Sequence, residues 1–157
     1  MTALHPAAQR VQSLLQQLGS AAEVVQLEAT ARTSADAAAA IGCTVAQIAK
    51  SLVFRAASGK PVLVIASGAN RIDEKKVANA LGEKIGKADA DFVRDRTGFA
   101  IGGVAPVGHA VAPQVFLDAA LGTLDPVWAA AGHPHAVFRT SFDELKRLTG
   151  GAVIEVA

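Results

Sequence analysis

Two apolar runs joined by a short turn constrain the fold of this chain more than any other sequence feature. Residues 51–56 and 62–67 are rich in β-branched and other apolar side chains, which is typical of strands. Residues 58–61 between them read Ser-Gly-Lys-Pro, a composition that favours a turn. The pattern predicts an antiparallel hairpin and places Lys50 immediately before its first strand, beside a sheet.

Short helices and strands alternate along the rest of the chain. Helical spacing of apolar residues and flanking caps predict helices over residues 5–18, 34–41, 45–49, 74–81, 90–96 and 141–148. Strand-like runs cover residues 22–28, 84–87, 114–118, 136–139 and 152–156. Ser34 is expected to cap the second helix. No repeat or linker interrupts this order, which indicates one domain over residues 1–157 of mixed α/β (α+β) class, with a central sheet.

Length and composition exclude several classes of protein. The chain has 157 residues, 51% hydrophobic and 18% charged, which is enough apolar material for a core and excludes intrinsic disorder. The formal net charge of +1 argues against coating of nucleic acid through overall charge. Apolar runs fall short of the roughly 20 residues of a membrane-spanning helix. With one cysteine and no signal-like start, the sequence predicts a cytoplasmic protein with neither a membrane nor DNA as partner.

Motifs for nucleotide or serine-nucleophile chemistry are missing from the sequence. The nearest match to a phosphate-binding loop, residues 82–88, is one residue too short and ends in Ala instead of Ser or Thr. No Gly-x-Gly-x-x-Gly follows a strand, and Ser67 lacks the preceding Gly-x of a nucleophile elbow. The sequence therefore gives little support for a nucleotide hydrolase, a dinucleotide-binding protein or a serine hydrolase.

Three histidines form a weak candidate for a metal site. His133 and His135 lie two residues apart and would share one face of a strand, and His109 could complete a three-ligand zinc site. No acidic or Cys ligand accompanies them at metal-site spacing, so loop histidines with local hydrogen bonds are the favoured interpretation. We therefore predict no metal and no cofactor, and we expect Cys43 to be a small buried residue.

Lys50 and a glycine-rich loop are the stronger candidates for a functional site. An ammonium at the start of an apolar strand is either solvated at the sheet edge or directed into a cleft. Gly102 and Gly103, with Pro106 stiffening the loop, could present backbone N–H groups to a carbonyl or a developing oxyanion. Taken singly, a solvated lysine and a plain tight turn are the simpler interpretations.

The order of five short motifs is more specific than any one of them. From the N-terminus they are QIAKSLVF (47–54), GANR (68–71), KAD (87–89), TGFAIGGVAPVG (97–108) and AGHPH (131–135). Together they resemble the YbaK/EbsC family of aminoacyl-tRNA deacylases, related to the editing domain inserted in bacterial prolyl-tRNA synthetases. The resemblance extends over about residues 31–157 and implies a central mixed, curved sheet flanked by short helices. It implies a free-standing hydrolase that removes a wrong small amino acid, of the Ala, Cys, Ser or Thr class, from tRNA.

The resemblance also assigns roles to individual residues. Lys50 matches the family's functional lysine and Gly102 the glycine of its Gly-x-x-x-Pro loop, so these two are the candidate catalytic residues. The candidate substrate-binding residues are Gly103, Pro106, Gly132 and His133. The candidate tRNA-binding residues, on a segment with a small excess of cations, are Arg71, Lys75 and Lys76. Family members use no metal and no covalent nucleophile, and water attacks the ester.

The expected partners are a mischarged aminoacyl-tRNA and, because the overall charge is near neutral, an aminoacyl-tRNA synthetase that presents it. Two alternatives remain open. One is a non-catalytic tRNA- or synthetase-binding module of the same fold, against which the retention of Lys50 and the Gly102 loop argues. The other is a metal hydrolase built on the three histidines, which metal analysis would reveal.

Overall fold

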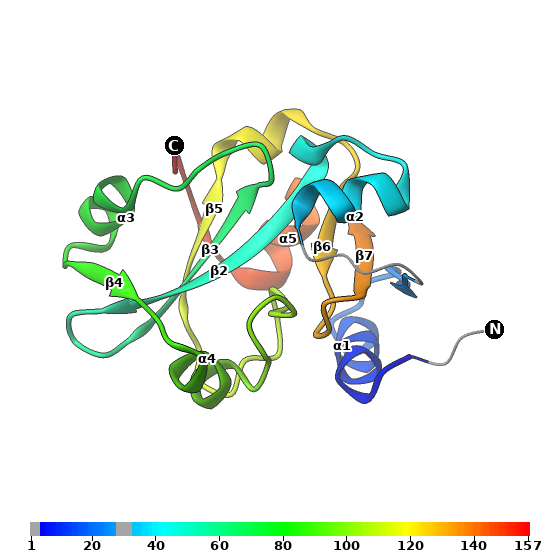
Figure 1. Cartoon of the computed structure of the whole chain (residues 1–157), viewed down its shortest axis with the longest axis horizontal. Coiled ribbons are helices and arrows are strands. Elements are labelled where there is room, and N and C mark those ends of the chain that lie inside the picture. The colour runs from blue at the N-terminus through cyan, green and yellow to red at the C-terminus, as the bar shows by residue number, and fades with distance from the viewer. Residues whose placement is uncertain (1–3, 28–32) are drawn as a thin grey trace.

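A computed structural model describes residues 4–27 and 33–157. The strands are β1 (Val24–Gln26), β2 (Ile48–Ala56), β3 (Pro61–Ser67), β4 (Ile85–Lys87), β5 (Gln114–Asp118), β6 (Val127–Ala130), β7 (Ala136–Thr140) and β8 (Ala152–Ile154). The helices are α1 (Pro6–Gln17), α2 (Ser34–Ile41), α3 (Glu74–Leu81), α4 (Ala90–Thr97) and α5 (Phe142–Thr149), with 3₁₀ turns at Val45–Gln47 and Ala119–Thr123. Within the described residues the strands form one eight-stranded sheet in the order β1-β7-β6-β2-β3-β5-β8, with β4 paired to β2 (Figure 1). Parallel and antiparallel pairs both occur, which confirms the mixed α/β class.

The predicted hairpin is confirmed as β2–β3, and it lies at the centre of the sheet. The strands pair antiparallel over seven residues each. β3 is buried along its whole length because β5 covers its other edge and helices pack over both faces. The prediction that Lys50 lies immediately before this strand is wrong. The 3₁₀ turn ends at Gln47, so β2 begins at Ile48 and Lys50 lies inside the strand.

The other edge of β2 has two different neighbours. Its first residues pair in parallel with β6, and this pairing ends at Ala49↔Ala129. Its last residues pair antiparallel with β4, beginning at Phe54↔Lys87. In Figure 1, β2 runs from β6 at one end to β4 at the other. Among the described residues, 50–53 therefore have a strand partner only on the β3 side, and the described sheet has a gap between β6 and β4.

The two faces of the sheet carry different helices. The largest hydrophobic cluster packs α1, α4 and α5 against one face, where Leu63 and Ile65 of β3 are fully buried. On the opposite face, Val77 of α3 packs against Val62. The buried alanines of α2 pack against Ile48, at the β6 end of this second face. Both faces of the sheet therefore carry helices.

Two local expectations need correction. Thr33, not Ser34, caps α2, since its side chain accepts a hydrogen bond from the Asp36 N–H at 3.1 Å. Strand β6 was not predicted, because four residues with two alanines carry little strand signal.

The strand expected over residues 22–28 is the three-residue β1. Glu28, and Ala31 where the family resemblance begins, lie outside the described residues. Among the described helices, none is long and apolar enough to cross a membrane.

Candidate active site

A cavity of about 580 Å³ occupies the gap between β6 and β4. The unpaired stretch of β2 runs along it, so side chains from both faces of that strand contribute to its lining. The loop after α4 and the start of α2 add further walls, and the apolar lining includes Ile48, Val53, Val93, Ile101 and Trp128. A concave, mainly apolar cavity with a few polar groups is the usual form of a small-ligand site.

Lys50 of β2 is part of the cavity lining, and its side chain contacts the loop that follows β3. Its Nζ donates a hydrogen bond to the main-chain carbonyl oxygen of Asn70 at 2.7 Å. The Asn70 side chain donates in turn to Oδ2 of Asp118 at 2.9 Å, and the same carboxylate oxygen accepts from the Ser67 N–H at 3.0 Å. Asp118 is buried at the end of β5. The ammonium is therefore held by a loop that β5 anchors, with further N–H donors left for a ligand.

Gly102 reaches the cavity on the loop between α4 and β5. Its φ of +90° is a conformation that glycine adopts readily and other residues rarely adopt. The next residue, Gly103, is buried and donates its N–H to the Ala100 carbonyl at 3.0 Å. A Cβ on Gly103 would lie 2.9 Å from Cα of His133, so the two loops are in direct backbone contact. Gly102 lines the cavity, whereas Gly103 and Pro106 are buried behind it.

The second predicted loop, residues 131–135, supports the first. Gly132 is buried against α1, where a Cβ would lie 2.8 Å from the Ala7 carbonyl oxygen. The residue of this loop that reaches the cavity is Pro134, and its Cγ lies 3.9 Å from the position of a Cβ on Gly102. Gly132 thus packs its loop against α1, and the same loop places Pro134 in the cavity wall.

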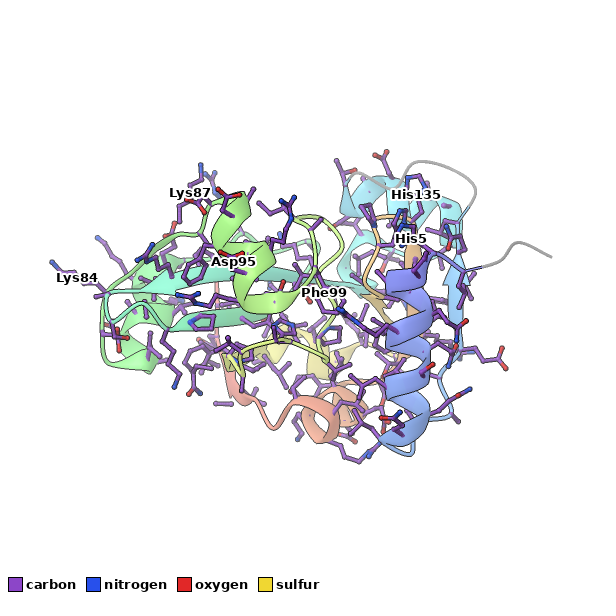
Figure 2. The ribbon with its side chains drawn as sticks, turned by 90° about the horizontal axis from the view of Figure 1, so that it is seen from below. His5, Lys84, Lys87, Asp95, Phe99 and His135 are labelled. Carbon is purple, nitrogen blue, oxygen red and sulfur yellow. The ribbon has the colours of Figure 1, made fainter. Side chains whose placement is uncertain are left out.

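The histidines are divided between two places. The ring centroid of His133 lies 4.3 Å from that of His5 and 5.3 Å from that of His135. This group lies beside the start of α1, where Figure 2 labels His5 and His135. His109 instead packs edge-on against Phe99 at 5.8 Å. Burial lowers the pKa of His109 and of His133, and the two neighbouring imidazoles lower the pKa of His133 further. In residues 4–27 and 33–157, no three His, Cys, Asp or Glu side chains are grouped to hold a metal ion, so the three-histidine site gains no support.

Comparison with known proteins identifies the family of this cavity-bearing fold. A family model described as the aminoacyl-tRNA editing domain matches residues 28–148. The chain belongs to this family. The match confirms the resemblance drawn from the five motifs.

Relatives of the editing domain share its fold over nearly the whole chain. The crystal structure of a candidate trans-editing enzyme for prolyl-tRNA synthetase is 44% identical, with a TM-score of 0.94 and 98% of each chain covered. The hypothetical protein APE2540 is 26% identical, with a TM-score of 0.87 over 94% of this chain and 98% of its own. The uncharacterized protein YwhH of Bacillus subtilis (strain 168) is 34% identical over 127 residues, or 81% of each chain.

The cations expected to bind tRNA lie outside the cavity of this editing domain. Arg71, Lys75 and Lys76 are exposed at and before the start of α3, and Lys76 donates to the main chain at the C-terminus. Lys87 of β4 lines the cavity together with Lys50. The sequence placed Lys87 in a motif and among the cations of residues 71–87, but not at the site of Lys50. Because no Asp or Glu occurs in the described lining, an anionic group there would meet two ammonium groups without a competing carboxylate.

The described lining holds no pair of nucleophile and base. Its hydroxyl groups belong to Thr33, Ser34 and Ser51, and no His, Cys, Asp or Glu is among these residues. Cys43 is half-buried outside the cavity, and burial raises the pKa of its thiol. The residues present are therefore suited to orienting a bound ester and a water molecule and to stabilising developing charge.

Proposed function

We propose that this editing domain is a trans-acting deacylase that hydrolyses the ester between a mischarged small amino acid and tRNA. The observation that carries the proposal is that Lys50 of β2 and Gly102 of the loop after α4 line one cavity. The family match and the similarity to a candidate trans-editing enzyme support the same activity. The substrates we expect carry Ala, Cys, Ser or Thr.

The chemistry of small amino acids makes such a hydrolytic site necessary. A synthetase pocket separates side chains that differ by one methylene by only about 1–3 kcal/mol, so some mischarging is unavoidable. A cavity of about 580 Å³ is larger than a small side chain requires. It therefore leaves room for part of the terminal nucleoside beside the amino acid.

In the proposed reaction, a water oxygen attacks the carbonyl carbon of the ester. The bond from that carbon to the ribose oxygen breaks, and a proton from the water passes to the ribose oxygen, releasing the free amino acid and the uncharged tRNA. Lys50 holds the 3′ end beside the water through its remaining N–H groups. The backbone at Gly102 stabilises the negative charge that develops on the carbonyl oxygen. Removal of one such donor costs about 2.7–4 kcal/mol in other hydrolases.

Release of amino acid from tRNAs charged separately with Ala, Ser, Thr, Cys and Pro tests this proposal, with a metal chelator in parallel reactions. We expect hydrolysis of one or two of the small amino acids, unaffected by chelator. Activity that disappears with chelator, together with stoichiometric zinc, would support the metal hydrolase instead. A folded protein that hydrolyses none of them would support the non-catalytic binding module.

A further inference from the structure

Ser51 carries a buried hydroxyl without a hydrogen-bond partner at the proposed active site. Among the described residues, three buried side-chain atoms lack a partner within the protein: Ser51 Oγ, His109 Nδ1 and Thr140 Oγ1. Of these three residues, Ser51 alone lines the cavity. A buried polar group that is left unpaired is unfavourable for folding, so its place in a ligand cavity indicates a role in binding.

The main chain of Ser51 also faces the gap in the sheet. In a strand, the N–H and C=O of one residue point to one edge, and those of the next residue point to the other. The carbonyl of Ile48 accepts from the Gly68 N–H on the β3 side at 2.6 Å, whereas the N–H of Ala57 donates to the Lys84 carbonyl on the β4 side at 2.8 Å. The pairing of β2 with β3 is continuous between these ends, so the odd-numbered residues of β2 point away from β3.

No strand in the described residues pairs with Ser51 on that side. The pairing with β6 ends two residues before it, at Ala49, and the pairing with β4 begins three residues after it, at Phe54. Ser51 thus directs its N–H and its C=O toward the gap, and the residue is part of the cavity lining. Because side chains alternate along a strand, the side chain of Lys50 lies on the opposite face of β2 and meets a ligand from another direction.

We propose that Ser51 binds the α-amino group of the aminoacyl ester, with its main-chain carbonyl and its Oγ accepting hydrogen bonds from the ammonium. The proposal rests on the deacylase function above. An α-ammonium brings three donors and a positive charge into the cavity, and the described lining offers no carboxylate to receive them. Oxygen acceptors without another partner are therefore the groups suited to bind it. Ser51 selects a free amino group, while Lys50 and Gly102 act on the ester.

The test compares the aminoacyl-tRNA that the panel identifies as the best substrate with the same tRNA carrying the N-acetylated amino acid. Wild-type protein should prefer the free amine. Ser51→Ala should lower kcat/KM for the free amine by about 10- to 150-fold, the range for one hydrogen bond to a charged group. It should have little effect on kcat/KM for the N-acetylated substrate. The ratio of kcat/KM between the free-amine and N-acetylated substrates should therefore fall.

Thr140→Val is the matched control, because it removes another unpartnered buried hydroxyl, on β7 and outside the cavity lining. Both variants should keep the wild-type Tm or exceed it, since neither loses a hydrogen bond, and Thr140→Val should keep wild-type kinetics. An unchanged kcat/KM in Ser51→Ala, or an equal loss on both substrates, would overturn the proposal.

If Ser51→Ala does not fold, the wild-type protein alone still tests the proposal. Equal hydrolysis of the acetylated and free-amine substrates by wild type would overturn the proposal without any variant. Hydrolysis of the unmodified substrate is measured in the same experiment, so a failure of the Ser51 proposal is distinguishable from a failure of the deacylase function.

Discussion

Replacing Gly103 by alanine should displace the proposed catalytic loop, because the two loops of the site touch at this residue. An added Cβ would lie 2.9–3.0 Å from Cα, C and N of His133. These are backbone atoms, which cannot swing aside as the end of a flexible side chain can. The His133 backbone is itself held by Gly132, which is packed against α1. The segment that carries Gly102 must therefore move instead.

The expected cost follows from the size of this overlap. Inserting a methyl group into a well-packed site costs about 1–3 kcal/mol. In a protein of this length each kcal/mol lowers the Tm by about 2–4 °C, so Gly103→Ala should lose about 2–12 °C. Gly86 of β4 is the matched control, because a Cβ there meets nothing within 4 Å. Gly86→Ala should be neutral or stabilise the protein by up to about 1 kcal/mol.

Thermal unfolding and single-turnover deacylation of both variants and wild type measure the two effects. Gly103→Ala should lose rate as well as stability, since misplacement of a reacting group by about 1 Å can cost about 100-fold. Gly86→Ala should keep the wild-type rate. A Gly103→Ala protein with wild-type Tm and wild-type rate would refute the backbone contact between the loops.

Three further predictions concern the surroundings of the cavity. Asp118→Asn should lower both the deacylation rate and the free energy of unfolding, the latter by about 1–3 kcal/mol, because the carboxylate holds the loop that positions Lys50; wild-type values in urea unfolding and kinetics would contradict this. Lys87→Ala should raise KM several-fold and weaken its salt dependence with little change in kcat, whereas Lys60→Ala in the exposed hairpin turn should not. Burial lowers the pKa of His109, so the unfolded state binds more protons below about pH 6.5 and the free energy of unfolding should fall as the pH drops through that region. His109→Gln should flatten this profile, and an unchanged profile would contradict the assignment.

Helices with local signals could be predicted from the sequence to within a residue or two. Asp73 and Asp89 accept hydrogen bonds from first-turn N–H groups of α3 and α4, at 3.0 and 2.8 Å. Gly82 and Gly98 end these helices in the left-handed conformation that was expected of them. Each signal lies within a few residues of the structure it determines.

The cavity could not be predicted, because it depends on pairing between distant segments. β6 becomes a strand through its parallel pairing with the start of β2, and the gap exists because that pairing stops at Ala49. The same dependence explains the cations. Lys75 and Lys87 belong to the same cationic segment of the sequence, but the pairing of β4 with β2 brings Lys87 alone of the two to the cavity.

The site residues divide in the same way. Lys50 and Gly102 were found through their motifs, and both line the cavity. Gly103 and Pro106 belong to the same motif but lie behind the cavity wall, since a motif does not show which of its residues faces a ligand. Ser51 lies within the motif of residues 47–54, but no role was predicted for it, because a serine in a strand becomes notable only when neighbouring strands leave it unpaired.

Single-turnover hydrolysis by Lys50→Ala tests the proposed active site most directly, with the best substrate of the panel and with thermal unfolding as the measure of folding. We predict a folded protein with a cooperative transition whose hydrolysis rate is lower than that of wild type by about 100-fold or more. Wild-type hydrolysis by folded Lys50→Ala would contradict the assignment of the site.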